Sequence, residues 1–375
     1  MTRWENCRNV LCVRLDNMGD LIMSAPALAA LKKTYACRIT LLTSSQARGM
    51  ADFITAIDDV LTFDVPWVKN DGPTGREAMA TLIQQIRSRH FDAAVIFTTF
   101  SQNPLPTAMM LYEAGIARTL AYCRENPYSL LSHWVPDAEP YSFIRHQVQR
   151  DLDLVQHIGV ETAHDDVLLR SPAESVWQHV YEKIRSLGIR PDKPWIVVHP
   201  GVSEVKREYP LAHWKDACRI LHTHYGIQFV VTGTEREIPI ANELVEALPH
   251  ATVSLAGMLP LEGFMALLRQ ARLVVTVNTA TAHIAAAFHT PLVVLYALTN
   301  PQHVPWKGRG YVLPYPVPPG LRSKNEVLRH LQETCFAEAT EVHPEDIVQA
   351  VCSVLLLKEI PAMPELVTGR TLTLV

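Results

Sequence analysis

Long apolar runs, paired cysteines and a large net charge are all missing from this sequence of 375 residues. No stretch of about 18 apolar residues occurs, and the opening MTRWENCRNV lacks the apolar segment of a signal peptide, so we expect a cytoplasmic protein without a membrane span. The seven cysteines are odd in number and form no CxxC pair, which disfavours disulfides and structural zinc and predicts reduced, mostly buried thiols. A net charge of −4 argues against a broad nucleic-acid interface.

Several catalytic signatures are missing as well. No GxGxxG follows a predicted strand, and neither GxxxxGK[ST] nor GxSxG occurs, so the sequence supports neither a dinucleotide-dependent dehydrogenase, nor a P-loop enzyme, nor a nucleophile elbow. Asp151 and Asp153 spell the DxD pattern of some metal-dependent transferases, but they lie within the helical pattern QRDLDLVQHIG. We interpret them as the solvated face of that helix and predict no catalytic metal and no cofactor.

What the sequence does contain is an alternation of short apolar runs with helical patterns, which predicts an α/β fold with parallel sheets and covering helices. The chain is too long for one ordinary core, so we expect two domains, residues 1–180 and 181–375, with a boundary near 170–190. The stretch ENPYSLLSHWVPDAEPYSF has no clear period and predicts an ordered surface loop. Strands in the first half are expected at 10–15 and in RITLLTS, VLTFDV and FDAAVIFTT, and helices near Ala51 and over 76–89.

The second half repeats the plan. Strands are expected in PWIVVHPG, QFVVTG and TVSLAG and over 273–277, and helices over 211–225, from Ile238, over 261–272 and over 283–288, with a final amphipathic helix within 341–360.

Asp20 follows the first predicted strand and stands where the next helix begins. Parallel sheets place their ligands at this end of the strands, and a carboxylate there can accept a proton from an attacking hydroxyl. The alternative is a capping role, since acidic residues at a helix start receive backbone N–H bonds. Asp16, four residues earlier, is expected to fix the turn by hydrogen-bonding its own backbone.

A second candidate segment is TVNTATAHIAAAFHTP, in which a turn leads from a strand into a helix. Its backbone N–H groups and the hydroxyls of Thr279 and Thr281 suit a diphosphate, although threonine also caps helices that bind nothing. His283 either donates to a phosphate or is a buried histidine satisfied by a carbonyl.

Two further positions carry charge near strand ends. In HPGVSEVKREYPLAHW, Lys206 lies beside Arg207 and could neutralise a departing phosphate, or it could be an ordinary surface lysine. In VVTGTEREIP, Glu235 and Glu237 could reach ribose hydroxyls or simply be first-turn helix acids.

Taken in order, these segments resemble glycosyltransferase family 9, the bacterial lipopolysaccharide heptosyltransferase family, from Val10 to Pro305. The motifs that carry the resemblance are RLDNMGDLIMSAPAL and LAGMLPLEGFMALLRQARLVVTVNTATAHIAAAF. The resemblance implies the glycosyltransferase B architecture, two facing Rossmann-like domains with the active site between them, and an inverting, metal-independent reaction.

The resemblance also implies roles by position. Asp20 matches the catalytic base, Lys206 the lysine that steadies the donor phosphates and His283 the closing histidine of the motif. The implied donor-binding set is Asn278, Thr279, Ala280, Thr281, Glu235 and Leu259, of which Leu259 would meet the nucleotide base with its backbone. Asn278 stands where the family commonly has aspartate, so a negative charge is lost. Ala280 stands where the family commonly has glycine, and its methyl group reduces the space available to an approaching phosphate.

The implied donor is a nucleotide sugar, ADP-heptose, and the implied acceptor is a glycan or lipid-linked glycan. Peripheral contact with a membrane would then be needed, although no strongly basic amphipathic helix occurs. Arginines and a lysine in loops of the first domain could bind an acidic acceptor sugar or could simply be solvated, namely Lys69, Arg118, Arg124 and Arg145. Acceptor specificity is expected in loops 69–76 and 102–111. A sugar-nucleotide epimerase of the same architecture and a non-catalytic nucleotide-sugar-binding paralogue remain as alternatives.

Overall fold

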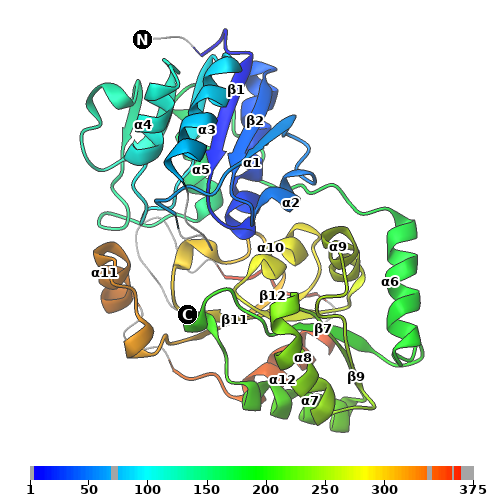
Figure 1. The fold of residues 1–375 in the computed structure, drawn as a ribbon. Coiled ribbons are helices and arrows are strands. Elements are labelled where there is room, and N and C mark those ends of the chain that lie inside the picture. Colours follow the sequence, from blue (N-terminus) through cyan, green and yellow to red (C-terminus); the bar gives the residue numbers. More distant parts are fainter. Residues whose placement is uncertain (1–3, 69–74, 336–339, 357–358, 365–375) are drawn as a thin grey trace. The chain divides into compact units, whose positions relative to one another are not determined.

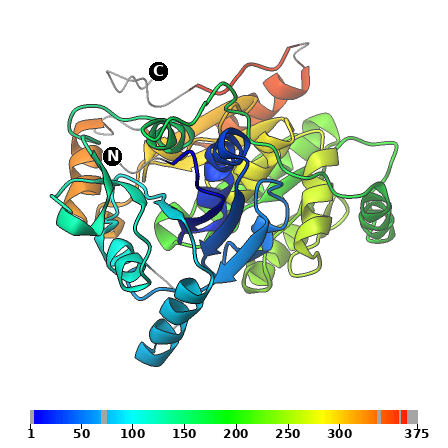
Figure 2. The same ribbon diagram turned by 90° about the horizontal axis from the view of Figure 1, so that it is seen from above.

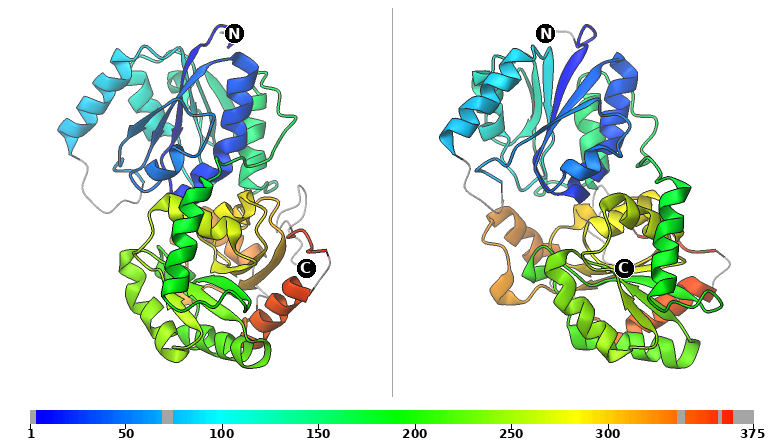
Figure 3. Two further views of the ribbon diagram at one scale, coloured as in Figure 1. Left: turned by 90° about the vertical axis from the view of Figure 1, so that its right-hand side faces the viewer. Right: turned by 45° about the vertical axis from the view of Figure 1, so that its right-hand side comes forward.

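The computed structural model describes residues 4–68, 75–335, 340–356 and 359–364. Within them the chain divides into two compact units, an N-terminal unit that ends at Arg170 and a C-terminal unit that begins at Ser171. This division lies at the lower end of the expected boundary range, 170–190. Helix α6 (Glu174–Ser186) belongs to the C-terminal unit because it packs against α9 (Leu261–Gln270), and Figure 3 shows it alongside that unit.

The N-terminal unit contains a six-stranded sheet in the order β3-β2-β1-β4-β5-β6, and all of its strand pairs are parallel. Parallel strands covered on both faces are apolar along their whole length, as the completely buried strand AAVI illustrates. The strands are β1 (Asn9–Arg14), β2 (Arg38–Thr43), β3 (Asp59–Thr62), β4 (Ala93–Ile96), β5 (Thr119–Cys123) and β6 (His133–Pro136).

Helices cover both faces of this sheet. On one face α1 (Met18–Tyr35) packs against α5 (Gln147–Gln156) and against the short α2 (Arg48–Ala51). On the other face α3 (Arg76–Ser88) and α4 (Leu105–Glu113) bury Leu82, Ile86 and Leu111 against strand residues such as Val13 and Ile96. Figure 1 labels these elements, and Figure 2 shows α1 and α3 on opposite sides of the first sheet.

The C-terminal unit contains a second parallel sheet, in the order β12-β11-β10-β7-β8-β9. Its core lies between the sheet and three helices and includes the buried Trp214, Phe229 and Val351. The strands are β7 (Trp195–His199), β8 (Gln228–Val231), β9 (Thr252–Ser254), β10 (Val274–Val277), β11 (Leu292–Ala297) and β12 (Gly310–Tyr315). The core helices are α7 (Leu211–Tyr225), α8 (Ile238–Ala247) and α12 (Pro344–Leu356), whereas α9 contacts α10 (Ala280–Ala287), and α11 spans Glu326–Cys335.

Two segments expected to be loops contain regular structure. The aperiodic stretch 125–143 includes β6, which pairs with β5 at the edge of the sheet, and the expected specificity loop 102–111 includes the start of α4. Both predictions were wrong for the same reason, since β6 ends at Pro136 and α4 has a proline in its first turn, and proline is a signal of turns and loops. Lys69 and most of the other expected loop, 69–76, lie outside the described residues.

Six cysteines are unpaired, as expected. Five of them are buried, namely Cys7, Cys12, Cys37, Cys123 and Cys218, and Cys352 is half-buried. No helix in the residues described is both long and apolar enough to cross a bilayer.

Gly310, at the start of β12, offers a test of the second sheet. Its φ is +134°, and a Cβ atom built on it would lie 1.8 Å from the backbone oxygen of Leu292 on β11. We expect Gly310→Ala to lower the free energy of unfolding by about 3 kcal/mol or more, because backbone must move and the conformation is strained. Urea denaturation measures this, with Gly320→Ala as the control, since nothing lies within 4 Å there. Equal stabilities of the two variants would contradict the expectation.

Candidate functional site

Asp20 lies in the first turn of α1, immediately after β1 and its connecting loop. The backbone N–H of Asn17, the N-cap residue, donates to Asp20 Oδ2 at 3.2 Å, so the capping contact expected as one alternative is present. The hydrogen bond that caps the helix also fixes the position of this carboxylate. Only 8% of Asp20 is exposed, and a second contact, to Arg14, fixes its other oxygen.

The guanidinium of Arg14 is completely buried at the end of β1 and lies among three carboxylates. Its Nε is 3.1 Å from Asp16 Oδ2, one terminal nitrogen is 3.2 Å from Asp20 Oδ1 and the other is 3.9 Å from Asp151 Oδ2. Burial alone would lower the pKa of Arg14, but the attraction of Asp16, Asp151 and Asp20 outweighs it and the pKa is raised. The arginine is therefore a permanent cation that orients Asp20.

Asp151 is not on a solvated face, and that interpretation was wrong. It is 1% exposed and accepts hydrogen bonds from Ser24 Oγ at 2.6 Å and from Gln147 Nε2 at 2.8 Å. Burial raises the pKa of Asp151, and Arg14 partly opposes the shift. A polar residue on an amphipathic helix can face inward when a neighbouring element satisfies it, and α1 supplies Ser24. Asp153 does reach the surface, where it pairs with Arg145 at 2.6 Å.

Asp16 also differs from its prediction. Its carboxylate contacts two side chains, the guanidinium of Arg14 and the amide of Gln102, which donates to Oδ1. Burial raises the pKa of Asp16 to about 6, although Arg14 opposes the shift. The loop between β1 and α1 is thus tied through Gln102 to the segment that follows β4.

The arginines expected to bind an acidic acceptor sugar are already engaged. Arg118 donates to the backbone oxygen of Asp92, and Arg124 donates to that of Glu139 at 2.5 Å. Arg145 pairs with the Glu139 carboxylate at 3.1 Å and is 19% exposed. These guanidinium groups stabilise the loops around β5 and β6.

In the C-terminal unit, the turn after β10 leads directly into α10. The helix begins at Ala280 and not at His283, so the N–H groups of Ala280 and Thr281 belong to its first turn and have no intrahelical acceptor, whereas that of Ala282 donates to the backbone oxygen of Thr279 at 3.1 Å. Thr279 is the N-cap residue, and its buried Oγ1 has no hydrogen-bond partner among the described residues. His283 lies in the same helix and is 8% exposed. Free donors at a helix start suit an anion.

The side chain of Asn278 explains its departure from the aspartate that is common in the family. Its Oδ1 accepts the backbone N–H of Ala297 at 3.2 Å, while its Nδ2 donates to the backbone oxygen of Ala297 at 3.4 Å. An amide supplies both groups, whereas an ionised carboxylate could only accept. The substitution is therefore compatible with an intact loop.

Lys206 and Arg207 lie in the turn after β7. Glu204 pairs with Lys206 at 3.0 Å and approaches Arg207 Nε at 3.6 Å. Arg207 also donates to the backbone oxygen of Asn278 at 3.2 Å, which joins this turn to the loop before α10. No role was predicted for Arg207, although its position beside Lys206 in one loop was a usable signal.

Glu235 and Glu237 have different neighbours. Glu237 accepts the backbone N–H of Thr234 at 2.6 Å, and a Cβ atom on Gly201 would lie 2.0 Å from its Oε1. Its charge also opposes the lowering of the His199 pKa that burial causes. Glu235 lies farther along, beside Gly257.

Leu259 is half-buried in the turn after β9. Lys183 of α6 donates to the backbone oxygen of the preceding Met258 at 3.2 Å. The sequence analysis did not single out this lysine.

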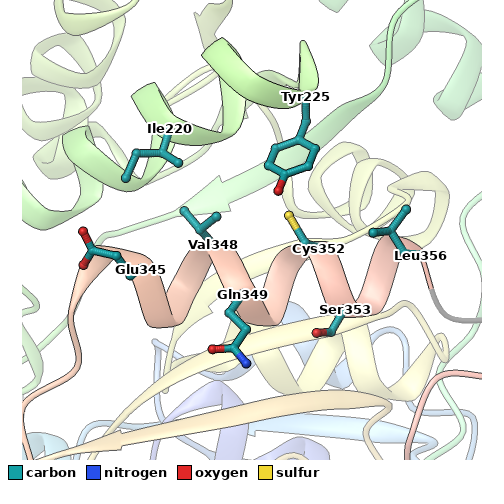
Figure 4. A pocket seen from close by; sticks show the side chains of 8 residues that line it. All are labelled: Ile220, Tyr225, Glu345, Val348, Gln349, Cys352, Ser353 and Leu356. Atoms are coloured by element: carbon teal, nitrogen blue, oxygen red, sulfur yellow. The ribbon is translucent and has the colours of Figure 1, made fainter.

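A search for metal-binding groups and the cavity beside α12 do not point to a different functional site. The described parts of the chain contain no group of three or more His, Cys, Asp or Glu side chains arranged to hold a metal ion. A cavity of about 500 Å³ lies between α7 and α12, where Figure 4 shows Tyr225, Val348, Cys352 and Leu356, but no candidate residue lines it.

The two Rossmann-like domains, each built around a six-stranded parallel sheet, have the glycosyltransferase B architecture. The sequence model of glycosyltransferase family 9 (heptosyltransferase) matches residues 79–344. The chain belongs to glycosyltransferase family 9 and is a glycosyltransferase.

Its sequence identity to individual relatives is low, but the alignments cover most of each chain. The lipooligosaccharide heptosyltransferase 2 of Haemophilus influenzae is 24% identical over 308 residues, which cover 79% of this chain and 85% of that protein. The solved glycosyl transferase family 9 protein of Veillonella parvula aligns with a TM-score of 0.72 at 14% identity and covers 95% of this chain and 99% of its own. The ADP-heptose lps heptosyltransferase II of E. coli gives a TM-score of 0.68 at 19% identity, with 93% and 98% covered.

The raised pKa of Asp16 predicts a pH-dependent stability. Because the folded state keeps this proton up to about pH 6, the contribution of Asp16 is fully present below about pH 4 and is lost as the pH rises through about 6. Between these limits we expect wild type to lose on the order of 1–3 kcal/mol relative to Asp16→Asn, which stays neutral. Urea denaturation at several pH values measures the difference. Asp52→Asn, at an exposed ion pair, is the control, and parallel curves for wild type and Asp16→Asn would refute the assignment.

Proposed function

We propose that this glycosyltransferase is inverting and metal-independent and moves heptose from ADP-heptose onto a lipopolysaccharide core or related glycan. The names of its relatives support the sugar and the pathway. Solved structures of the E. coli heptosyltransferase WaaC with ADP and with ADP-2-deoxy-2-fluoro heptose support the nucleotide. The observation that carries the proposal is the Asp20 carboxylate, held by Arg14 and by the Asn17 amide at the start of α1.

In the proposed reaction Asp20 is the general base. Its carboxylate accepts the proton of an acceptor hydroxyl while that oxygen forms a bond to the anomeric carbon and the bond from this carbon to the diphosphate breaks. Attack from the face opposite the leaving group inverts the anomeric configuration. The two contacts that hold Asp20 prevent its rotation, which is the orientation effect expected of a positioned base.

The leaving nucleoside diphosphate gains negative charge in this step. We assign its stabilisation to Lys206, to His283 and to the first-turn N–H groups of α10 with the Thr279 hydroxyl. Such preorganised donors act where charge develops and can replace a metal ion. Glu235 is assigned to the ribose and the backbone at Leu259 to the nucleotide base.

A lipid-linked acceptor would bring the enzyme to the cytoplasmic face of a membrane as a peripheral protein. We therefore propose a cytoplasmic location with membrane contact limited to that acceptor.

Replacement of the base tests the mechanism. We expect Asp20→Asn to lower kcat about 10²–10⁴-fold, since the amide cannot accept the proton. Radiolabelled or mass-spectrometric transfer from ADP-heptose to a core acceptor measures this. The matched control is Asp346→Asn, because Asp346 caps α12 through the N–H of His343 at 2.8 Å just as Asp20 caps α1. Asp346→Asn should keep wild-type turnover. Comparable losses in the two variants, or none in Asp20→Asn, would remove the base role.

Replacement of the phosphate-binding lysine tests the donor site. We expect Lys206→Ala to weaken ADP binding at least about tenfold, the cost of one charge-assisted contact. Isothermal titration calorimetry with ADP alone measures this without an acceptor. Lys215→Ala is the control, because Lys215 is equally exposed and equally paired, with Glu243 at 2.7 Å. If both variants bind ADP like wild type, Lys206 does not contact the diphosphate.

A further inference from the structure

Asp151 reaches the proposed base from a distant part of the sequence. It lies in the middle of α5, which packs against α1, and its side chain is almost completely buried. Arg14 lies between the two carboxylates, since one terminal nitrogen of its guanidinium is 3.2 Å from Asp20 Oδ1 and the other is 3.9 Å from Asp151 Oδ2. None of the comparisons assigns Asp151 a role.

Two side chains fix the Asp151 carboxylate in this place. Ser24 Oγ donates to Oδ2 at 2.6 Å, and Gln147 Nε2 donates to Oδ1 at 2.8 Å. Both donors favour the ionised carboxylate, as does the charge of Arg150 on the same helix, whereas burial favours the protonated one. Ser24 belongs to α1, and its hydroxyl also lies 3.2 Å from the backbone oxygen of Asp20. One hydroxyl therefore connects Asp151 to the helical turn that carries the proposed base.

The carboxylates around Arg14 outnumber the positive charge that they share. Asp16, Asp20 and Asp151 all contact its guanidinium, and all four side chains are buried. The repulsion among the carboxylates acts on Asp16, because the charges of Asp20 and Asp151 both raise its pKa. The same repulsion from Asp16 and Asp151 must favour the protonated form of Asp20. Asp151 thus opposes the effect of Arg14, which favours the ionised form.

Two further charged side chains of α5 are paired away from Arg14. Arg150 is completely buried and contacts the carboxylates of Asp137 at 2.8 Å and Glu139 at 2.6 Å. Asp153 pairs with Arg145 near the surface. Because the charge of Arg150 is already shared by two carboxylates, it does not replace Arg14 as the cation that Asp151 faces.

A general base must be held in place and must also remain basic. A guanidinium 3.2 Å away holds Asp20, but its attraction favours the ionised carboxylate and therefore opposes the acceptance of a proton. Catalysis by a general base depends on its affinity for that proton. A second carboxylate on the far side of the guanidinium offsets this loss of basicity and leaves the contact to Asp20 intact.

We propose that Asp151 is a positioning residue of the reaction, which acts through Arg14 to keep Asp20 basic while Arg14 holds it. The inference rests on the proposed function, because it takes Asp20 to be the general base. It also gives a task to Ser24, whose hydrogen bond helps to keep Asp151 ionised.

Titration of Asp20 itself tests the inference without requiring transfer. NMR of the full chain, isotopically labelled at the aspartate carboxyl carbons, follows each carboxyl group, and the Asp20 signal is the one that Asp20→Asn removes. We expect Asp151→Asn to lower the midpoint of the Asp20 titration by at least about 0.5 pH unit, because Arg14 then attracts Asp20 without this competitor. Asparagine has the shape of aspartate, and the Ser24 hydroxyl can turn to accept from the new amide.

A second variant reaches the same charge through Ser24. Ser24→Ala removes a donor from Asp151, so that protonated Asp151 persists to higher pH and the Asp20 midpoint falls in the same direction by a smaller amount. The matched control is Asp153→Asn, because Asp153 lies on the same helix and also pairs with an arginine, Arg145 at 2.6 Å, but does so near the surface. It should leave the Asp20 midpoint unchanged. Thermal unfolding verifies that each variant is folded, and Ser24→Ala decides the question if Asp151→Asn is not.

The pH dependence of transfer connects Asp151 with the reaction. In Asp151→Asn the acidic limb of kcat should move to lower pH by the same amount as the Asp20 midpoint. Above that limb kcat should fall about two- to threefold, since a weaker base accepts a proton less readily. KM for ADP-heptose should keep its wild-type value, because Asp151 belongs to the N-terminal unit and the donor is assigned to the C-terminal one.

An Asp20 midpoint that stays the same or rises in Asp151→Asn, or that moves equally in Asp153→Asn, would overturn the inference. A loss of kcat without displacement of the acidic limb would also overturn it, since a purely structural defect has that effect. The proposed function fails in a different way. If the Asp20 midpoint moves and the acidic limb of kcat does not follow, Asp20 is not the base, although Asp151 still controls its titration.

Discussion

The buried guanidinium of Arg14 is the interaction on which the N-terminal unit's candidate site depends. It joins carboxylates from three places, the loop after β1, the first turn of α1 and the middle of α5. Removing one partner from a buried ion pair leaves an uncompensated charge and typically costs 3–5 kcal/mol. Asp20 is therefore held in position by a network that reaches well beyond its own turn, and α5 contributes to the site although none of its residues matches the family motifs.

The candidate site of the C-terminal unit is shaped by different interactions from those around Arg14. There the loop before α10 is shaped by neutral contacts, the Asn278 amide to the Ala297 backbone, and by the Arg207 contact to Asn278. Its free groups are backbone N–H donors and the Thr279 hydroxyl. Fixed dipoles suit a diphosphate because they attract its negative charge. They also spare the empty site the cost of burying a permanent cation away from water.

The sequence predicted the parts of the fold that carry a long, regular signal. The strand, turn and helix around Asp20 and around Asn278, the two parallel sheets and the helices α3 and α7 were foreseen from period and apolar runs. Elements in proline-containing segments, such as β6 and α4, were not, because proline is a signal of turns and loops. Asp151 was misplaced and Arg14 overlooked for a related reason. A sequence pattern treats a charged residue as exposed. Only the packing of α1 against α5 shows which charged side chains are buried with a partner.

The parallel pairing of the central strands has a consequence for biosynthesis. Val10 of β1 pairs with Ala93 of β4, about 80 positions later, and Val197 of β7 pairs with Val274 of β10 over a similar separation. Neither sheet can close its middle until most of its own domain has left the ribosome, and contacts so distant in the chain form slowly. During translation one edge of β1 stays unpaired until β4 emerges, and one edge of β7 until β10 emerges, and such exposed apolar strand edges favour aggregation.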